Sequence, residues 1–441
     1  MRILKLTSGV EKQLLRSRQN RDAKAERVAA RIVDDVRRRG DSAVVTWTKK
    51  LDGIDLRREG VWISSGDIAR ATARVSSDFL RAVTHAARNV RRVAEKQLPR
   101  PWTIEVEPGV TIGQVVRPIE TIGCYIPGGR HALVSTLVMM AVPALAAGVP
   151  RIVVVCPRPN AELLAAAKLL AITEVARIGG AQAIAALAYG TKSVPRVEKI
   201  FGPGNRYVTT AKQFVSSDCA IDLPAGPTEA IVLATEGNPQ WIAADLLAQA
   251  EHAPDAGSFF VTTSKTLAAK VQAEVTAQLQ QLPRENPAHV SIQRSGAIVL
   301  AASIVAACDF VSRFAPEHLS LPSDSGALLK KCQAVGTIFV GPWAAQSLGD
   351  YASGSNHVLP TGGWARRRGG LTAADFVKCI SVQSITRRGF AGLADTVQTL
   401  ARGEGLQAHA NSVSVRQTSP EARSNLLGRR KGASLLGEAH R

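Results

Sequence analysis

Residues that could bind a metal ion stand one helical turn apart in the stretch Gln249-Ala-Glu-His252. If this stretch is helical, Gln249 and His252 lie on one face and can reach the same ligand. Further ligands are available downstream, because Asp350, His357 and His409 stand in polar, glycine-rich or terminal stretches rather than on apolar faces. An imidazole, a carboxylate and an amide oxygen suit a borderline cation such as zinc. The spacing alone is more typical of an exposed helix face, so the metal site depends on these partners.

The strongest acid-base pair is Glu317-His318, which follows Pro316. A carboxylate beside an imidazole can divide acid and base work, because imidazole is the side chain whose unperturbed pKa lies near neutrality. Pro316 restrains the backbone before the pair and would help to hold it in a fixed presentation. As an isolated dipeptide, such a pair lies more often in a solvated loop than in a catalytic centre.

Glycine-containing stretches stand at the ends of three expected strands, where open α/β sheets bind their ligands. They are Tyr125-Ile-Pro-Gly-Gly-Arg130, Gly179-Gly-Ala-Gln-Ala183 and Gly202-Pro-Gly-Asn205, and none of them contains G-x-G-x-x-G. Glycine lets the backbone approach a phosphate or a ribose, although a tight turn between a strand and a helix requires it too.

The elements that must position these residues follow a βαβ rhythm. Residues 11–39 and 66–98 have helical periodicity, with Gly40 and Pro99 as stops. Beyond them, short apolar β-branched runs alternate with Ala- and Leu-rich helical segments, which is typical of buried parallel strands. The predicted strands are residues 151–156, 175–178, 197–201, 230–234, 258–262, 297–300 and 337–340, and the predicted helices are residues 135–148, 161–171, 181–189, 205–216, 239–251, 264–281 and 302–313. We therefore expect an α/β protein with two α/β units.

The composition is that of an ordinary globular protein, with 45% hydrophobic and 21% charged residues in a chain of 441. Its apolar stretches are too short to span a bilayer, and no apolar signal-peptide core follows the N-terminus. We therefore expect a cytoplasmic protein with no membrane partner. The six cysteines are scattered without a Cys-x-x-Cys pair, which favours reduced structural thiols.

The formal net charge of +19 raises the hypothesis of nucleic-acid binding. However, the chain shows no helix-turn-helix, zinc-finger or RNA-recognition motif, and only 5% of its residues are aromatic and able to stack on bases. Attraction of anionic small molecules or a generally basic proteome explains the charge as well. We expect no nucleic-acid partner, and a basic, flexible tail at residues 417–441.

Taken together, the ordered motifs of the chain resemble the histidinol dehydrogenase family. They are Tyr125-Ile-Pro-Gly-Gly129, Gly179-Gly-Ala-Gln-Ala-Ile-Ala-Ala186, Phe201-Gly-Pro-Gly-Asn205, Ala225-Gly-Pro-Thr-Glu229, Gln249-Ala-Glu-His252, Phe314-Ala-Pro-Glu-His318 and Gly349-Asp-Tyr-Ala-Ser-Gly-Ser-Asn-His357. The resemblance extends over about residues 5–416, and chance agreement of so many ordered motifs is negligible. It implies an enzyme of the last steps of histidine biosynthesis, which oxidises L-histidinol through L-histidinal to L-histidine with NAD and one zinc ion per subunit.

The resemblance also implies two incomplete Rossmann-like domains, with small helical or extended terminal pieces that intertwine in a homodimer. The expected divisions are an N-terminal helical arm at residues 1–22, a first Rossmann-like domain at 23–124 and 229–372, a second at 125–228, C-terminal dimerisation segments at 373–416, and the tail at 417–441.

For the site, the resemblance implies a zinc ion that anchors the substrate through its imidazole and amino groups. The implied zinc ligands are Gln249, His252, Asp350 and, from the partner subunit, His409. His318 would take the hydroxyl proton as hydride leaves, and Glu317 would activate the water that hydrates the aldehyde. The other implied substrate contacts are Ser135, Thr228, His357 and, across the dimer, Glu404, and the implied NAD contacts are Tyr125, Gln182 and Asn205.

Some positions depart from the family pattern without removing any implied ligand. Thr228 stands where serine is common, Ala253 stands where glycine or an acidic residue is usual, and Arg366-Arg-Arg-Gly369 replaces a Phe-Ser-Ser-like stretch. Two alternatives stay open. One is a related zinc-dependent alcohol dehydrogenase for a small anionic diol, against which the retention of His357 and Glu404 argues. The other is a nucleic-acid binder, which would show steep salt dependence and no metal requirement.

Overall fold

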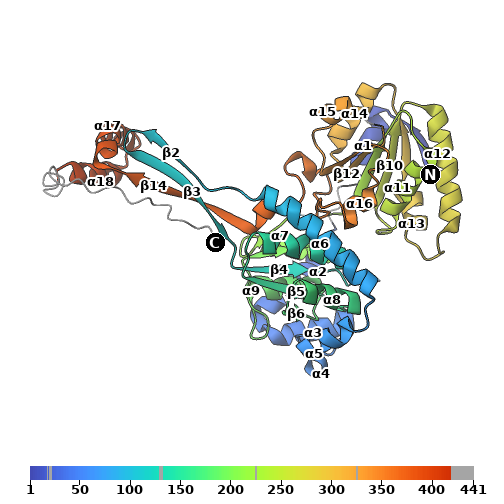
Figure 1. Ribbon diagram of the computed structural model, residues 1–441, viewed down its shortest axis with the longest axis horizontal. Coiled ribbons are helices and arrows are strands. Elements are labelled where there is room, and N and C mark those ends of the chain that lie inside the picture. The colour runs from blue at the N-terminus through green and yellow to red at the C-terminus, as the bar shows by residue number, and fades with distance from the viewer. Residues whose placement is uncertain (17, 19–21, 129–132, 224–225, 324–325, 419–441) are drawn as a thin grey trace. The chain divides into compact units, whose positions relative to one another are not determined.

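The computed structural model describes residues 1–16, 18, 22–128, 133–223, 226–323 and 326–418 (Figure 1). The chain divides into two compact units. Unit 1 comprises Met1–Leu98 and Pro118–Val377, and unit 2 comprises Pro99–Arg117 and Lys378–Arg441. The basic segment expected to be flexible falls mostly on residues 419–441, which lie outside the described residues.

A six-stranded parallel sheet forms one half of unit 1, in the order β1-β11-β10-β9-β12-β13. Its strands are β1 (Arg2–Lys5), β9 (Glu229–Leu233), β10 (Gly257–Thr262), β11 (Ala297–Leu300), β12 (His318–Leu321) and β13 (Thr337–Val340). Alternate residues of β9 and β10 pack into two different apolar clusters, so helices cover both faces. The helices are α1 (Ser8–Arg16) and α14 (Ile304–Phe314) on one face, and α11 (Pro239–Ala250), α12 (Lys265–Gln281) and α13 (Ala288–Arg294) on the other.

A five-stranded parallel sheet forms the other half of unit 1, in the order β6-β5-β4-β7-β8. Its strands are β4 (Thr121–Tyr125), β5 (Arg151–Val155), β6 (Val175–Ala176), β7 (Lys199–Phe201) and β8 (Ala220–Ile221), and the connecting helices are α7 (Val134–Ala146), α8 (Ala161–Leu169), α9 (Gly180–Tyr189) and α10 (Arg206–Val215). Apart from the N-terminal edge strand β1, the strands of each sheet follow from a central strand, β4 or β9, and the strand order reverses beside it. Such a reversal opens a crevice between neighbouring loops at the sheet edge.

The N-terminal helices pack on the five-stranded half. They are α2 (Ala23–Arg39), α3 (Asp41–Asp52), α4 (Leu56–Glu59), α5 (Ser65–Thr72) and α6 (Ser77–Gln97). Helix α2 contacts α9 and α10, while α5 contacts α8 and α6 contacts α7. This packing differs from the expected grouping of residues 23–124 with 229–372, because helical periodicity shows that a face is buried but not which sheet buries it.

The described residues of unit 2 form a three-stranded sheet and two helices. The strands are β2 (Trp102–Glu107), β3 (Val110–Pro118) and β14 (Val377–Ile385), in the order β14-β3-β2, and the helices are α17 (Arg387–Gly403) and α18 (Gln407–Thr418). Among its described residues, the buried apolar side chains are only Val110 and three alanines. Larger apolar side chains such as Ile104, Leu400 and Val415 are more than half exposed. This unit therefore presents an apolar surface that its own residues do not cover.

The predicted strands and helices of the two α/β series are confirmed, with boundaries that shift by a few residues. The expected helix at residues 11–39 is wrong as one element, because α1 ends at Arg16 and Asp22 caps the start of α2 with its carboxylate. The helix expected at 66–98 is likewise divided, because Ser76 caps α6. The remaining short elements are α15 (Gly326–Lys331), α16 (Gln346–Tyr351) and the 3-10 helices Trp364–Arg366 and Ala373–Phe376. In the described part of the chain, no helix combines the length and the apolar character needed to cross a membrane.

Candidate active site

The acid-base pair lies at the amino-terminal edge of the six-stranded sheet, at the start of β12 and next to β9. Glu317 directly precedes β12 and His318 is its first residue, paired with Ala230 of β9. Both side chains are buried, with exposed fractions of 6% and 3%. The hypothesis of a solvated loop at this dipeptide is therefore wrong. The short strand β12 escaped the sequence analysis, and its pairing between β9 and β13 is what buries the pair.

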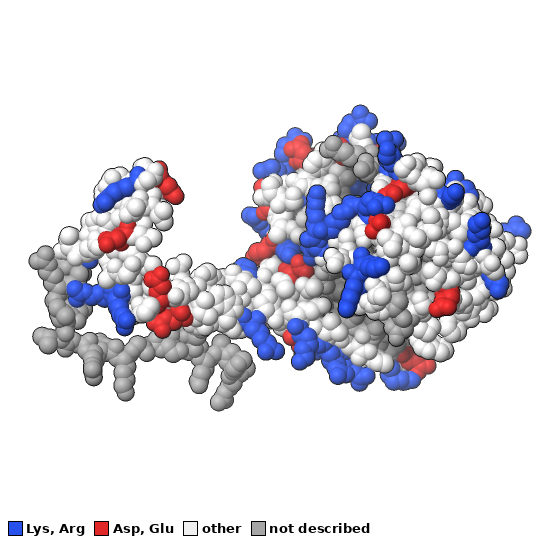
Figure 2. Space-filling view, turned by 90° about the horizontal axis from the view of Figure 1, so that it is seen from above, with Lys and Arg blue, Asp and Glu red and all other residues white. Residues whose placement is uncertain are grey.

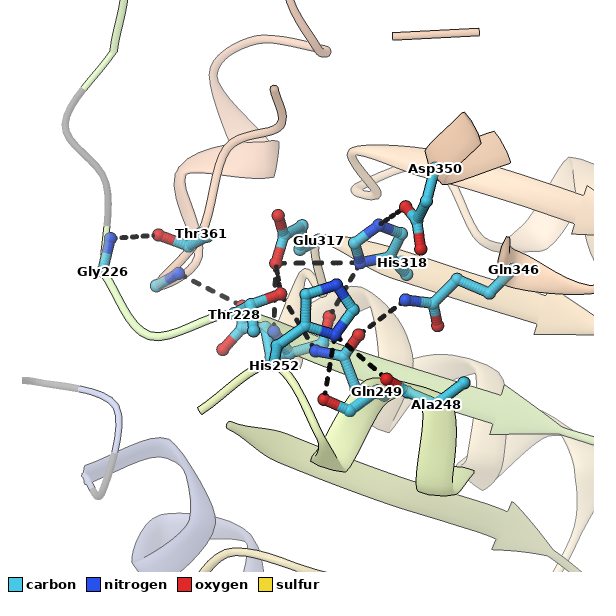
Figure 3. Close-up of polar contacts among 12 residues, drawn as sticks. Gly226, Thr228, Ala248, Gln249, His252, Glu317, His318, Gln346, Asp350 and Thr361 are labelled. Atoms are coloured by element: carbon cyan, nitrogen blue, oxygen red, sulfur yellow. Dashed lines mark hydrogen bonds and ion pairs between the residues drawn. The ribbon is translucent and has the colours of Figure 1, made fainter. Parts of the chain in front are cut away.

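The Glu317 carboxylate is held by two donors. Its Oε2 accepts hydrogen bonds from the Thr228 hydroxyl at 2.5 Å and from the Glu229 backbone N–H at 3.0 Å (Figure 3). Burial raises the pKa of Glu317 above its usual range, although the His318 imidazole and the Thr228 hydroxyl act in the opposite direction. A carboxylate with a raised pKa is better matched to a proton transfer near neutral pH.

The two nitrogens of the His318 imidazole have different neighbours among the described residues. Its Nδ1 lies 3.4 Å from the Glu229 carbonyl oxygen and 3.7 Å from Glu317 Oε2. Its Nε2 has no hydrogen-bond partner in the described structure, and the nearest carboxylate oxygen, Asp350 Oδ1, is 3.7 Å away. Burial lowers the pKa of His318, but the charges of Glu317 and Asp350 outweigh it, so the pKa is raised. With the proton on Nδ1, Nε2 offers its lone pair to a substrate proton.

The three predicted zinc ligands of unit 1 surround this pair (Figure 3). Gln249, in the last turn of α11, is fully buried; its Nε2 donates to Thr228 Oγ1 at 2.9 Å, and its Oε1 accepts from Gln346 Nε2 at 2.6 Å. Asp350 lies on α16, one turn after Gln346. Burial acts to raise the pKa of Asp350, but the neighbouring imidazoles, His318 first, lower it overall, so the group is a carboxylate at neutral pH.

His252 is oriented as a metal ligand would be. It lies just beyond the C-terminus of α11, and its Nδ1 is 3.0 Å from the Ala248 carbonyl and 3.2 Å from the Gln249 carbonyl. Ligating histidines commonly donate one ring N–H to a carbonyl, which leaves the other nitrogen for the metal. The described residues contain no group of three or more His, Cys, Asp or Glu able to hold a metal. The unit 1 donors are one imidazole, one carboxylate and one amide, which fit a zinc shell that needs further ligands.

His357 connects this cluster to the five-stranded half of unit 1. Its Nδ1 lies 2.8 Å from the Asp350 carbonyl oxygen and its Nε2 lies 3.2 Å from Thr136 Oγ1 in the first turn of α7. Burial lowers the pKa of His357, which favours the neutral imidazole. Ser135 is the residue before Thr136, half-buried, and no hydrogen bond joins it to the cluster.

The three predicted NAD contacts lie at the carboxyl edge of the five-stranded sheet. Tyr125 ends β4 and its hydroxyl accepts from the Gly180 N–H at 3.3 Å. Gln182, on α9, is fully buried and donates to Asp52, while its Oε1 has no partner among the described residues. Asn205 follows β7 and caps α10 with its side chain. β4 and β7 flank the reversal of strand order, which is where open parallel sheets bind ligands. Residues 129–132 of the first glycine-containing stretch lie outside the described residues.

The remaining two predicted residues belong to unit 2. Glu404 caps the C-terminus of α17 and His409 lies in the first turn of α18, and both side chains are exposed. An exposed position leaves both side chains available to a second chain.

Four residues of the site were not identified from the sequence. The Gln346 side chain forms a hydrogen bond with Gln249, and the Thr136 hydroxyl forms one with His357. Arg18 and Glu229 form a buried ion pair beside Glu317. The four-residue spacing between Gln346 and Asp350 could have suggested a shared helix face. No sequence signal links Arg18 to Glu229, because they stand 211 positions apart.

Comparison with known proteins agrees with this geometry. The sequence pattern of the histidinol dehydrogenase family matches residues 15–417. The chain belongs to the histidinol dehydrogenase family. It is 43% identical over 394 residues to histidinol dehydrogenase of Photobacterium profundum, covering 88% of each chain. It is 42% identical over 417 residues to that of Methanosarcina mazei, covering 93% of this chain and 96% of the relative.

A solved structure agrees as well. The crystal structure of histidinol dehydrogenase from Elizabethkingia anophelis superposes with a TM-score of 0.89 at 36% identity, covering 96% of this chain and 99% of the other. The chain is therefore an oxidoreductase of histidine biosynthesis with a mixed α/β fold. Figure 2 shows the Lys and Arg side chains scattered over the visible face among neutral and acidic ones.

Proposed function

We propose that this histidinol dehydrogenase carries out a zinc-dependent, NAD-linked oxidation of L-histidinol through L-histidinal to L-histidine. The observation that supports it best is the buried Glu317-His318 pair, with His318 Nε2 unpartnered among the described residues and three zinc-compatible donors around it. The five-stranded half of unit 1, with the strand order of a Rossmann-like fold, supports a dinucleotide site at Tyr125, Gln182 and Asn205.

Gln249, His252 and Asp350 would hold zinc, together with His409 of the partner subunit. When bound, zinc would anchor the imidazole and amino groups of the substrate, and NAD would accept hydride at a near-attack distance. In the first step, His318 Nε2 would take the hydroxyl proton while the carbinol carbon loses hydride, which gives the aldehyde. His357, held neutral by burial, and Thr228 would orient the substrate, with Ser135 at the start of α7 as a further contact.

The second oxidation needs a water molecule, because an aldehyde has no hydroxyl proton to lose. Glu317 would take a proton from that water as its oxygen adds to the aldehyde carbon. His318 would return the proton that it took in the first step to the aldehyde oxygen, which gives the hydrate and leaves His318 free to act as a base again. His318 would then take a hydroxyl proton from the hydrate while its carbon loses a second hydride, which gives the carboxylic acid. The raised pKa of Glu317 suits this task, since a base is most effective when its pKa is near the working pH.

We also propose a homodimer in which unit 2 of one chain completes the site of the other. Among its described residues, unit 2 buries almost no large apolar side chain, and it exposes Leu400 and Val415 on its helices and Leu406 between them. A second chain could cover this surface. Glu404 and His409, exposed in their own unit, would then reach the substrate and the zinc of the partner. A cytoplasmic location is consistent with the free cysteines, which are buried except for Cys379.

The test is NADH formation from L-histidinol, measured with and without a chelator and against a small sulfonated diol. We expect NADH from L-histidinol alone, two molecules for each substrate consumed, and none after chelation. Preference for the diol would show the related alcohol dehydrogenase instead. Single-turnover traces of Glu317→Gln should show the second oxidation slowed more than the first, whereas His318→Asn should slow both.

A further inference from the structure

We propose that Arg18 and Glu229 are positioning residues that together hold Glu317 and His318 in their reactive arrangement. The inference rests on the proposed roles of Glu317 and His318, and it assigns a task to two residues to which the proposed function gives no contact with substrate or cofactor. Arg18 comes from the stretch between α1 and α2, and Glu229 is the first residue of β9. Their side chains are only 9% and 5% exposed.

Glu229 holds the acid-base pair through its backbone. Its N–H donates to Glu317 Oε2 at 3.0 Å, and its carbonyl oxygen lies 3.4 Å from His318 Nδ1. One peptide segment therefore sets the position of the carboxylate and fixes the tautomer of the imidazole. A displacement of residue 229 would change both groups at once.

The Glu229 side chain prevents that displacement. The Arg18 guanidinium donates two hydrogen bonds to its carboxylate, from Nε to Oε2 at 2.6 Å and from Nη2 to Oε1. Glu229 Oε1 also accepts a hydrogen bond from the Gly362 N–H at 3.1 Å. A bidentate arginine-carboxylate pair fixes direction as well as distance. Burial raises the pKa of Glu229 to about 7, and the charge and hydrogen bonds of Arg18 act in the opposite direction, so loss of Arg18 would raise this pKa further.

Arg18 also holds the backbone that leads into Glu317. Its guanidinium donates to the carbonyl oxygens of Phe314 and Ala315, the latter at 3.3 Å, and stacks 3.7 Å above the centre of the Phe314 ring. Ala315 has φ of 52°, a left-handed conformation that is unfavourable for a residue with a Cβ. Arg18 thus ties the end of α14, which leads into the catalytic pair, to the start of β9, where the Glu229 backbone contacts that pair.

A cavity beside the Arg18–Glu229 ion pair makes this ion pair accessible to a chemical test. It has a volume of about 390 Å³ and is lined by Arg18, Thr228 and Glu229, among others. It is large enough to admit a guanidinium ion in place of a deleted Arg18 side chain. Restoration by that ion would separate a positioning role from general destabilisation, because an unfolded chain cannot be restored in this way.

The experiment compares Arg18→Ala with Arg16→Ala, a change at the exposed arginine that ends α1. We expect Arg18→Ala to lower kcat by roughly 10- to 100-fold with KM for L-histidinol nearly unchanged, because small misplacements of reacting groups have effects of this size. Low, non-denaturing guanidinium should restore part of the loss, and Arg18→Lys should retain more activity than Arg18→Ala. Arg16→Ala should behave as the wild type.

A double variant covers the case in which Arg18→Ala fails to fold. Arg18→Met with Glu229→Gln leaves no unpaired buried charge, and we expect it to fold, to remain slow and not to respond to guanidinium. Wild-type kcat in either variant, or an Arg18→Ala defect that guanidinium leaves untouched, would overturn the proposal.

A readout without substrate keeps this test separate from the proposed function. The NMR signals of the His318 ring, assigned with His318→Asn, should shift in Arg18→Ala and not in Arg16→Ala. A wild-type chain that leaves L-histidinol unoxidised would reject the proposed reaction, and the His318 signals would still decide the positioning role. Unchanged His318 signals in Arg18→Ala would reject the positioning role of Arg18 and Glu229.

Discussion

The hydroxyl of Thr228 is the most informative single group to remove, because it joins the two halves of the site. It donates to Glu317 Oε2 at 2.5 Å and accepts from Gln249 Nε2 at 2.9 Å. Thr228→Val keeps the shape of the side chain but deletes both hydrogen bonds. Thr228→Ser keeps the hydroxyl and loses one methyl group, so it is the matched control.

The expected magnitude follows from the hydrogen bond to Glu317. A hydrogen bond to a charged group contributes about 1.5–3 kcal/mol. Since about 1.4 kcal/mol corresponds to a factor of ten, L-histidinal oxidation by Thr228→Val should fall by roughly 10- to 150-fold near neutral pH. Leaving the buried Gln249 N–H unpaired should also lower the free energy of unfolding by about 1–3 kcal/mol.

The pH dependence gives a sharper test than the rate. The Thr228 hydroxyl lowers the pKa of Glu317, so its loss raises that pKa further. Glu317 must be ionised to accept a proton from water, and a higher pKa means that ionisation needs a higher pH. The acidic limb of kcat/KM for L-histidinal should therefore move to higher pH in Thr228→Val and stay in place in Thr228→Ser. An acidic limb that is the same in all three proteins would refute the role given to this hydroxyl.

Three further predictions concern the metal, the dimer and the stability. His252→Ala should lose both zinc and turnover, whereas His85→Ala, a change at an exposed histidine, should keep both. Chelation should abolish turnover of the wild type without unfolding the protein. Full activity of metal-free protein would contradict the zinc assignment. Co-expressed His409→Ala and Glu317→Gln chains should recover about a quarter of wild-type activity, because about half of randomly paired dimers are heterodimers and each heterodimer has one intact site of two. If no activity returns, His409 belongs to the site of its own subunit. Burial raises the pKa of Asp245 from 3.8 to about 6, so the free energy of unfolding of the wild type falls as pH rises through this window. Measured by urea unfolding, Asp245→Asn should be more stable than the wild type by about 1–3 kcal/mol at about pH 8 and equally stable below about pH 4. A stability difference that does not change with pH would reject the raised pKa.

The sequence by itself determined the α/β class and the residue types of the site. Runs such as Ile152–Val155 and Ile231–Leu233 are apolar on every residue, which only a parallel strand buried on both faces requires, so their positions were predictable from local pattern. Gln249 and His252 were predicted together because a helix places such spacings on one face. The ordered motifs identified the family, which the comparison confirms.

Only the tertiary structure decided which elements pack together and what state the site residues are in. The periodicity of α2 shows a buried face but not that α9 and α10 bury it, and the short β12 becomes a strand only because β9 and β13 pair with it. That pairing buries Glu317 and His318 and so shifts their pKa values. Arg18 and Glu229 stand 211 positions apart in the sequence, and their contact forms only when the fold brings these distant segments together. The local sequence around either residue therefore does not predict it.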